Sequence, residues 1–166
     1  MKDSIRIASG QGFWGDLPNA PINQVRKGPI DYLVMDYLAE VTMSIMQKQK
    51  LRNSDYGYAR DFVGVVSEIL PDIAEKGIKV ISNAGGVNPE ACKEQILAAI
   101  DKQGYDDIKV AVVDGDNILD DLDILIEEGH PLKNMETGEP ITTVKDELLS
   151  ANVYFGSRPI VEALNK

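Results

Sequence analysis

The chain has 166 residues, of which 43% are hydrophobic and 27% are charged, as in an ordinary soluble globular protein. Its 17 basic and 27 acidic residues give a net charge of −10, which argues against nucleic acid or a membrane as partner, because phosphate groups are bound by clustered Lys and Arg. The single cysteine, Cys92, excludes an intrachain disulfide and fits a reducing compartment, so we expect a cytoplasmic protein.

Short apolar runs alternate with helical patterns along the whole chain. Four nearly continuous apolar runs are typical of strands buried in a parallel sheet: Ser4–Ala8, Tyr32–Met35, Lys79–Ser82 and Lys109–Val113. Apolar periodicity, prolines and terminal glycines predict helices over 21–28, Leu38–Lys50, Arg60–Lys76, Pro89–Gln103, Ile118–Glu128 and the last residues of the chain. Pro71 predicts a kink or restart, and Asn88 is expected to cap the helix that follows it.

The alternation of strands and helices predicts one α/β domain over residues 1–166. We expect a parallel sheet with helices on both faces, a Rossmann-like or flavodoxin-like three-layer sandwich. The polar, turn-rich stretch 129–143 interrupts this rhythm and is interpreted as an excursion from the sheet edge or a small hairpin.

Gly10, Gly12 and Gly15 form a G-x-G-x-x-G run after the first predicted strand, which is the outline of a dinucleotide-binding fingerprint. In that fingerprint the last glycine leads directly into a helix whose N-terminus holds the pyrophosphate. Here the sequence continues DLPNAP, in which two prolines disfavour a helix and Asp16 brings a negative charge. We therefore disfavour NAD and interpret the glycines as a flexible, ligand-binding loop.

Four loops are expected to meet at the carboxyl edge of the sheet, where open α/β sheets bind ligands: 10–16, 36–40, 83–88 and 114–117. In the third loop, glycines would let backbone amides approach an anion at the start of a helix, and asparagines would add neutral partners. The alternative is a tight turn with an asparagine cap. The ligand-binding candidates in the last two loops are Asn83, Gly85, Gly86, Asn88 and Asp114.

Three carboxylates are the catalytic candidates. Asp36 and Glu40 are four residues apart, a spacing that would place both on one side of a helix start, where they could exchange protons or bind a hard cation. The alternative is a favourable charge in a first helical turn. The stretch DYGYARDF adds Asp61 as the third candidate, with Tyr58 and Arg60 as ligand-binding residues. The alternatives are a helix cap for Asp61, a packed ring for Tyr58 and a pair with one of the many acidic groups for Arg60.

Four further side chains have two interpretations each. Arg158 follows a glycine turn and either reaches an anion or stays on the surface, and Trp14 either covers an apolar ligand or anchors its loop. Cys92 shares a helix face with apolar residues, so we expect a buried, inert thiol rather than a nucleophile. His130 has no second histidine to complete a metal site and is expected to be solvated or capping. The sequence leaves any metal undetermined.

Six stretches resemble, in the same order and with similar spacing, the N-terminal part of the AtuA-like family, the acyclic terpene utilisation proteins. They are ASGQGFWGD, DYLVMDYLAEVTM, DYGYARDF, VISNAGGVNPEAC, METGEPI and SANVYFGSRPIVEAL. The resemblance covers almost the whole chain and implies a role beside enzymes that degrade acyclic terpenoids through CoA thioesters. Family members usually continue beyond the last helix, so it also implies that a C-terminal part or a partner subunit completes the site.

Three hypotheses about function follow. The first is a catabolic enzyme or enzyme subunit that acts on a small carboxylate or acyl-CoA thioester by hydratase, lyase or isomerase chemistry, with CoA carried by the substrate. The second is a non-catalytic binding or assembly module that needs a C-terminal part or a partner, a homo-oligomer being one form. The third is an NAD-dependent oxidoreductase.

Overall fold

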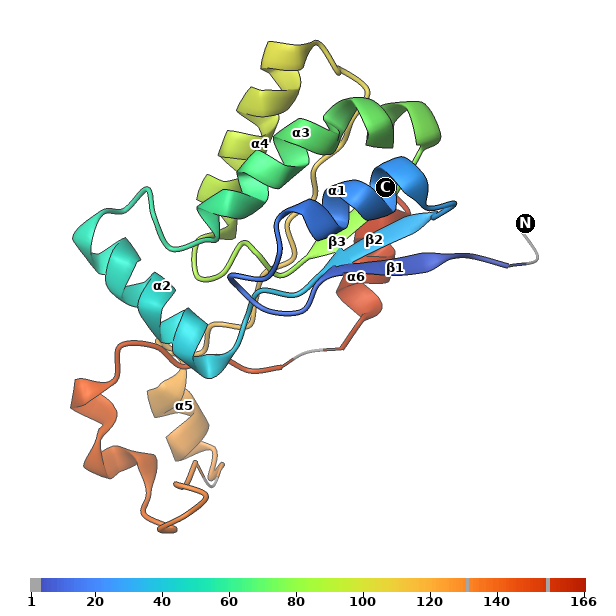
Figure 1. Ribbon diagram of the computed structural model, residues 1–166. Coiled ribbons are helices and arrows are strands. Elements are labelled where there is room, and N and C mark those ends of the chain that lie inside the picture. Colours follow the sequence, from blue (N-terminus) through green and yellow to red (C-terminus); the bar gives the residue numbers. More distant parts are fainter. Residues whose placement is uncertain (1–3, 131, 155) are drawn as a thin grey trace. The chain divides into compact units, whose positions relative to one another are not determined.

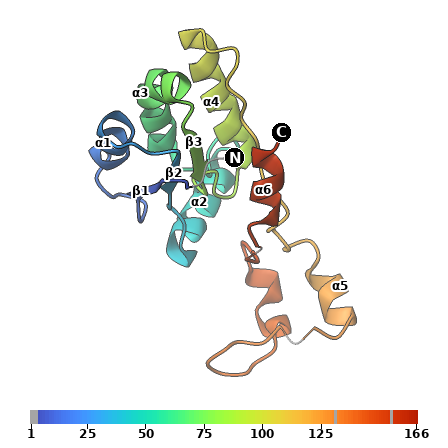
Figure 2. The same cartoon turned by 90° about the vertical axis from the view of Figure 1, so that its right-hand side faces the viewer.

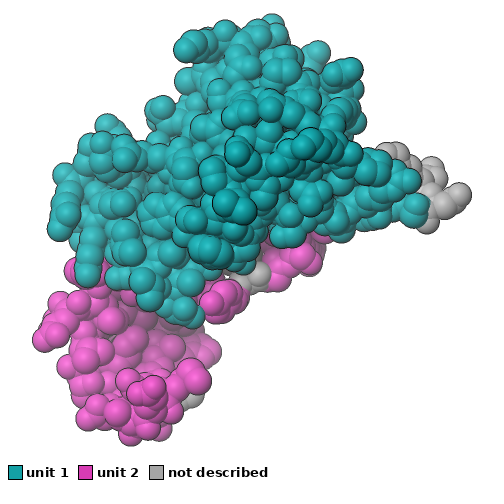
Figure 3. Space-filling view, viewed as in Figure 1, with its two compact units in different colours: residues 1–112 teal, residues 113–166 magenta. Residues whose placement is uncertain are grey.

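The computed structural model describes residues 4–130, 132–154 and 156–166. Contacts along the chain divide it into two compact units, residues 1–112 and residues 113–166 (Figure 3). Each unit is described by itself below. The expectation of a single domain over the whole chain stays a prediction.

Unit 1 contains a parallel sheet of three strands in the order β1-β2-β3 (Figure 1). The strands are β1 (Ile7–Gln11), β2 (Tyr32–Met35) and β3 (Lys79–Ser82), and Ile7 lies opposite Tyr32, which lies opposite Lys79. The predicted parallel α/β class is confirmed. β1 begins and ends later than the predicted Ser4–Ala8, because Gly10 and Gln11 are buried and belong to the strand rather than to the loop after it.

The helices of unit 1 follow the apolar periodicity of the sequence. They are α1 (Asn19–Lys27), α2 (Glu40–Arg52), α3 (Arg60–Lys76) and α4 (Pro89–Gln103). The limits of α3 and α4 match the prediction, since each ends before a glycine in the left-handed region, Gly77 with φ +67° and Gly104 with φ +75°. The predicted restart at Pro71 is wrong, because α3 continues unbroken through that residue.

The helices α1, α3 and α4 form a layer on one face of the sheet of unit 1. α1 packs on β1, β2 and α3, and α3 packs on α4 (Figures 1 and 2). The strand residues facing this layer are buried, among them Ala8, Leu33 and Met35. On the opposite face Ile7 is 61% exposed and Tyr32 is only partly buried. The second helix layer of the expected sandwich is not found in the described part of unit 1, so the three-layer arrangement stays a prediction.

The fourth predicted strand, Lys109–Val113, is wrong. This stretch forms no strand in the described chain, although Ile108 and Val110 are partly buried against the core of unit 1. Exposed and partly buried side chains occur along it. Its apolar residues therefore indicate partial burial, while its main chain pairs with no strand in the described chain.

Unit 2 has little regular structure. The helix α5 (Leu122–Glu127) is shorter than the predicted Ile118–Glu128, because residues 118–121 form a turn beside a bridge between Asn117 and Asn152. An antiparallel bridge between Lys133 and Pro140 gives stretch 129–143 a hairpin-like pairing, as expected. Two short 3-10 helices (Ile141–Thr143 and Lys145–Glu147) and the final helix α6 (Arg158–Leu164) complete the unit.

Candidate functional site

The loops after β1, β2 and β3 meet at the carboxyl edge of the sheet, as predicted. The Asp36 amide donates to the Gln11 carbonyl at 3.0 Å, and the Tyr37 amide donates to Asn83 Oδ1 at 2.8 Å. One main-chain bond and one bond to a side chain therefore tie three separate segments together. The fourth loop, 114–117, belongs to unit 2, so its place at this edge stays a prediction.

Asp36 is oriented by the side chain of Asn83. Asn83 Nδ2 donates to Asp36 Oδ1 at 2.7 Å while its Oδ1 accepts from the Tyr37 amide, so one amide side chain holds both residues. The Leu38 amide also donates to Asp36 Oδ1, at 3.3 Å. Asp36 and Asn83 are both exposed. The carboxylate is therefore held in place without a cation and remains open to solvent.

Glu40 and Asp36 do not form the pair on one helix that their spacing of four residues suggested. α2 begins at Glu40, and Ala39 precedes it in an extended conformation, so Asp36 lies before the helix. The prediction that Asp36 and Glu40 share one side of a helix start is wrong for this reason. Thr42 fixes the start of α2, since its Oγ1 accepts from the Ala39 amide at 2.6 Å. Glu40 is exposed in the first turn, where a negative charge is favourable.

Asp61 is held by the glycine-rich loop. Trp14 Nε1 donates to Asp61 Oδ1 at 2.9 Å, which links the loop after β1 to the first turn of α3. Asp61 does not cap the helix, because the residue before α3 is Ala59. Trp14 packs partly against the core, so it anchors its loop. The contact leaves Asp61 exposed, with one oxygen oriented.

Tyr58 and Arg60 both precede Asp61 in the sequence and differ in exposure. Tyr58 is buried, and burial raises the pKa of its hydroxyl. Its ring packs in the core, which is the alternative to ligand binding given above. Arg60 is exposed, and its guanidinium lies 4.6 Å from the centroid of the Tyr56 ring. Of these two ligand-binding candidates, Arg60 is the one at the surface.

The three glycines of the fingerprint serve different purposes. A Cβ on Gly10 would lie 2.8 Å from Pro21 Cβ and 2.9 Å from Leu33 Cδ1, so packing requires a glycine there. The Gly12 amide donates to Asp16 Oδ2 at 3.1 Å, so the loop's own carboxylate occupies a donor that a phosphate would use in a dinucleotide fingerprint. Gly15 has φ +105°, a conformation that favours glycine. α1 begins four residues later, at Asn19.

Close packing also explains the glycines after β3. Gly86 has φ +54°, and a Cβ there would lie 2.3 Å from Met46 Sδ and 2.6 Å from the Gly57 carbonyl oxygen. A Cβ on Gly85 would lie 2.9 Å from the Pro89 Cβ. This turn therefore brings β3, α2 and the segment before α3 into contact.

The Asn88 side chain fastens a neighbouring loop. Its Nδ2 donates to the carbonyl oxygens of Ser54 and Tyr56 at 2.7 and 2.8 Å. Asn88 occupies the N-cap position of α4, as predicted, but its side chain makes no capping bond to the helix. The amides of Gly86, Val87 and Asn88 donate to main-chain oxygens. These donors are already used, and an anion at this turn stays a prediction with little support from the geometry.

Two buried polar side chains at the same edge were not among the site residues predicted from the sequence. Tyr37 is 1% exposed and Gln11 is 4% exposed, yet Tyr37 Oη and Gln11 Oε1 have no hydrogen-bond partner. Burial, and then the Asp61 carboxylate, raise the pKa of Tyr37 above its ordinary value. The available signal was their position, since both stand where a buried strand ends.

Cys92 is buried as predicted, and burial raises the pKa of its thiol to about 12, which favours the interpretation of an inert thiol. Within the described part of the chain, no group of three His, Cys, Asp or Glu side chains is placed to hold a metal ion. None of the described helices combines the length and the apolar character needed to cross a membrane.

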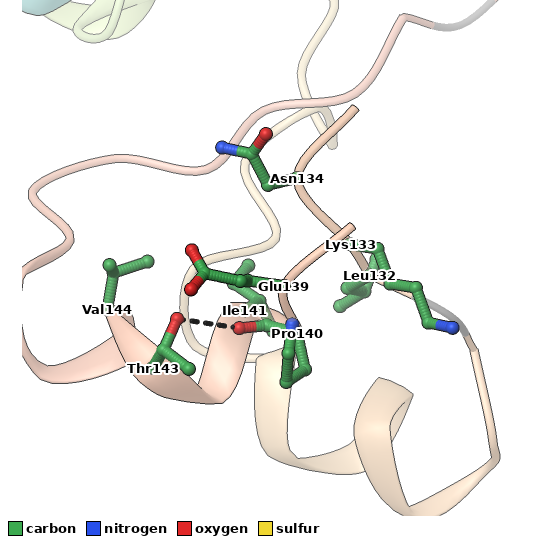
Figure 4. Close-up of a pocket in the computed structure, with 8 residues that line it drawn as sticks. All are labelled: Leu132, Lys133, Asn134, Glu139, Pro140, Ile141, Thr143 and Val144. Carbon is green, nitrogen blue, oxygen red and sulfur yellow. Dashed lines mark hydrogen bonds between the residues drawn. The ribbon is translucent and has the colours of Figure 1, made fainter. Parts of the chain in front are cut away.

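The candidates in unit 2 lie on its surface. Arg158, at the start of α6, pairs with Glu162 at 3.0 Å, and both side chains are exposed. Asp114 is exposed in an irregular loop. An open pocket of about 310 Å³ lies elsewhere in this unit, and none of the predicted site residues lines it (Figure 4). Its lining consists of Leu132, Lys133, Asn134, Glu139, Pro140, Ile141, Thr143 and Val144.

The three-stranded parallel sheet and its helices place the chain in the α/β class, with Asp36 and Asp61 each oriented by a hydrogen bond from a distant side chain. The model of one family, described as "Acyclic terpene utilisation family protein AtuA", matches residues 5–166. The chain therefore belongs to this family, and its functional context is acyclic terpene utilisation. A search of curated proteins and a search of solved structures found no match.

Proposed function

We propose that the protein is a catabolic enzyme, or an enzyme subunit, that acts on a small carboxylate or its CoA thioester by hydratase, lyase or isomerase chemistry. One observation carries this proposal. Asp36 and Asp61 are exposed at the carboxyl edge of the sheet, and each accepts a hydrogen bond from a side chain 47 residues away. A carboxylate held through one oxygen by a neutral N–H donor has its other oxygen available, as a proton acceptor requires.

The side chains around Asp61 suit the two ends of an acyl substrate. Phe13 and Leu17, on the same loop as Trp14, are 61% and 72% exposed, and they offer apolar surface to a hydrocarbon chain. Arg60, adjacent to Asp61 in sequence, offers a cation to a carboxylate or phosphate group. We assign proton transfer to Asp61 and Asp36 and anion binding to Arg60. A cytoplasmic location is part of the proposal and is supported by the single, reduced Cys92.

Turnover of an α,β-unsaturated acyl-CoA tests this proposal. Crotonyl-CoA in D₂O would lose the absorbance of its conjugated double bond on hydration, and NMR would detect deuterium at the α carbon after proton transfer. Asp61→Asn and Asp36→Asn should each lower the rate roughly 100-fold or more, as expected for a group that transfers a proton. Asp101→Asn, which changes an exposed carboxylate in the last turn of α4, is the matched control. Wild-type rates in both edge variants would refute the assignment.

A second candidate function, a binding or assembly module, is favoured by the open face of the sheet. Ile7 is 61% exposed there, and Tyr32, Val34 and Ile81 are partly buried, so an apolar surface faces away from the helices of unit 1. Sedimentation equilibrium of the wild type and of Ile7→Lys would test it. Self-association that Ile7→Lys abolishes, without turnover in the wild type, would favour the module over the enzyme.

A further inference from the structure

Two buried polar atoms without partners lie at the carboxyl edge of the sheet, and neither is used in the function proposed above. They are the hydroxyl of Tyr37 and the side-chain carbonyl oxygen of Gln11. An unpaired polar atom in the interior is unfavourable, and native proteins contain few of them. Its presence beside exposed carboxylates indicates that a bound group completes the hydrogen bonding.

The ring of Tyr37 is fixed, so its hydroxyl cannot turn toward solvent. The Tyr37 amide donates to Asn83 Oδ1 at 2.8 Å. Its ring meets Phe62 edge to face, with centroids 5.7 Å apart and planes at 74°. Phe62 directly follows Asp61, whose carboxylate is held by Trp14. The hydroxyl therefore belongs to the same region as the proposed proton acceptor.

Gln11 is tied to the same segment. Its main-chain carbonyl accepts from the Asp36 amide at 3.0 Å, one residue before Tyr37. Its Nε2 donates to the Phe13 carbonyl at 3.3 Å, which leaves Oε1 as the unpaired atom. Adjacent segments thus contribute one buried donor and one buried acceptor.

The chemistry of these two atoms selects the bound group. Burial keeps the Tyr37 hydroxyl protonated at neutral pH, because the pKa is raised, so it offers an O–H donor. A carbonyl oxygen has lone pairs and no hydrogen, and therefore matches Tyr37. Gln11 Oε1 can only accept, and therefore matches an O–H or N–H group.

We propose that Tyr37 is a ligand-contacting residue whose hydroxyl donates a hydrogen bond to the carbonyl oxygen of a bound acyl group. The identity of the acyl group rests on the proposed function, whereas the contact with a carbonyl does not. Because Tyr37 is only 1% exposed, a ligand reaches its hydroxyl only when the segments packed around it open.

Two probes and a matched pair of variants test the contact. Crotonamide offers a neutral carbonyl with an adjacent N–H, and crotonyl-CoA offers the thioester. Each is titrated into the full chain carrying ring-¹³C tyrosine, in which the Tyr37 signal is identified by its loss in Tyr37→Phe. We expect the Tyr37 signal to move and Tyr37→Phe to raise the Kd of both probes about tenfold, the loss of one hydrogen bond to a bound group. Tyr105→Phe, at a partly buried ring packed on the same core, should leave both constants unchanged.

The outcomes separate this inference from the proposed function. A Tyr37 signal that moves with crotonamide, in a protein without turnover of the thioester, would support the contact and remove the enzymatic proposal. Turnover and Kd values that Tyr37→Phe leaves unchanged would overturn the contact and leave the enzyme standing. A Tyr37 signal that neither probe moves, together with a higher melting temperature for Tyr37→Phe, would show a water-bonded or unpaired phenol and overturn the inference.

Discussion

Replacing Gly86 with alanine should destabilise unit 1 strongly. Gly86 has φ +54°, and a left-handed conformation costs an alanine about 1–2 kcal/mol. The added Cβ would also lie 2.3 Å from Met46 Sδ and 2.6 Å from the Gly57 carbonyl oxygen. Met46 is fully buried, and the carbonyl belongs to the main chain, so relieving both contacts costs roughly 1–3 kcal/mol more, as for other overpacked cores. We expect a total loss of about 2–5 kcal/mol.

Urea denaturation followed by tryptophan fluorescence measures this loss in the correct unit, because Trp14 is the single tryptophan and lies in unit 1. Gly104→Ala is the matched control, since Gly104 has φ +75° but an added Cβ there meets nothing within 4 Å. It carries the conformational cost alone, about 1–2 kcal/mol. If Gly86→Ala lost no more free energy of unfolding than Gly104→Ala, the packing explanation of the turn after β3 would be refuted.

Three further changes have defined outcomes. Asn88→Ala removes the hydrogen bonds to the Ser54 and Tyr56 carbonyls and should lower the free energy of unfolding by about 1–2 kcal/mol in the same urea assay. If Asn88 acted only as a helix cap, the loop before α3 would stay as protected from proteolysis in this variant as in the wild type. Gly64→Ala, inside α3 with open space around the added Cβ, should raise the free energy of unfolding by about 0.5–1 kcal/mol. A lower free energy of unfolding would contradict a helix at this position. The folded pKa of Cys92, about 12 against an ordinary 9.0, means that its contribution to stability is complete below pH 9 and is lost as the pH rises toward 12; Cys92→Ser should flatten this alkaline decline in thermal melts.

The elements that the sequence predicted correctly are those whose own residues define them, without reference to a partner elsewhere in the chain. The limits of α3 and α4 could be predicted because apolar residues recur at helical spacing and glycines in the left-handed conformation end both helices. Lys109–Val113 could not be distinguished from a strand, because its apolar residues indicate burial, whereas a strand also needs a neighbouring strand to pair with. β1 was placed too early because its one glycine, Gly10, was attributed to the loop that follows.

The candidate site divides in the same way. Parallel topology predicted that the loops carrying Asp36 and Asn83 would meet at one edge of the sheet, and these two side chains are hydrogen-bonded there. The contact between Trp14 and Asp61 could not be predicted, since it depends on the path of a loop whose residues have no regular spacing. Nor could the helical spacing of Asp36 and Glu40 reveal that α2 begins only at Glu40.

The glycine-rich motif shows how one pattern can come from two physical causes. In a dinucleotide fingerprint, glycines give a phosphate access to backbone amides. In this chain Gly10 is required because Pro21 and Leu33 leave no room for a Cβ, and the Gly12 amide is taken by Asp16. The loop's contribution to a site then comes from its side chains, above all from Trp14, which orients the Asp61 carboxylate. A ligand at this edge would therefore meet a carboxylate and apolar surface, which is a better match for an acyl group than for a pyrophosphate.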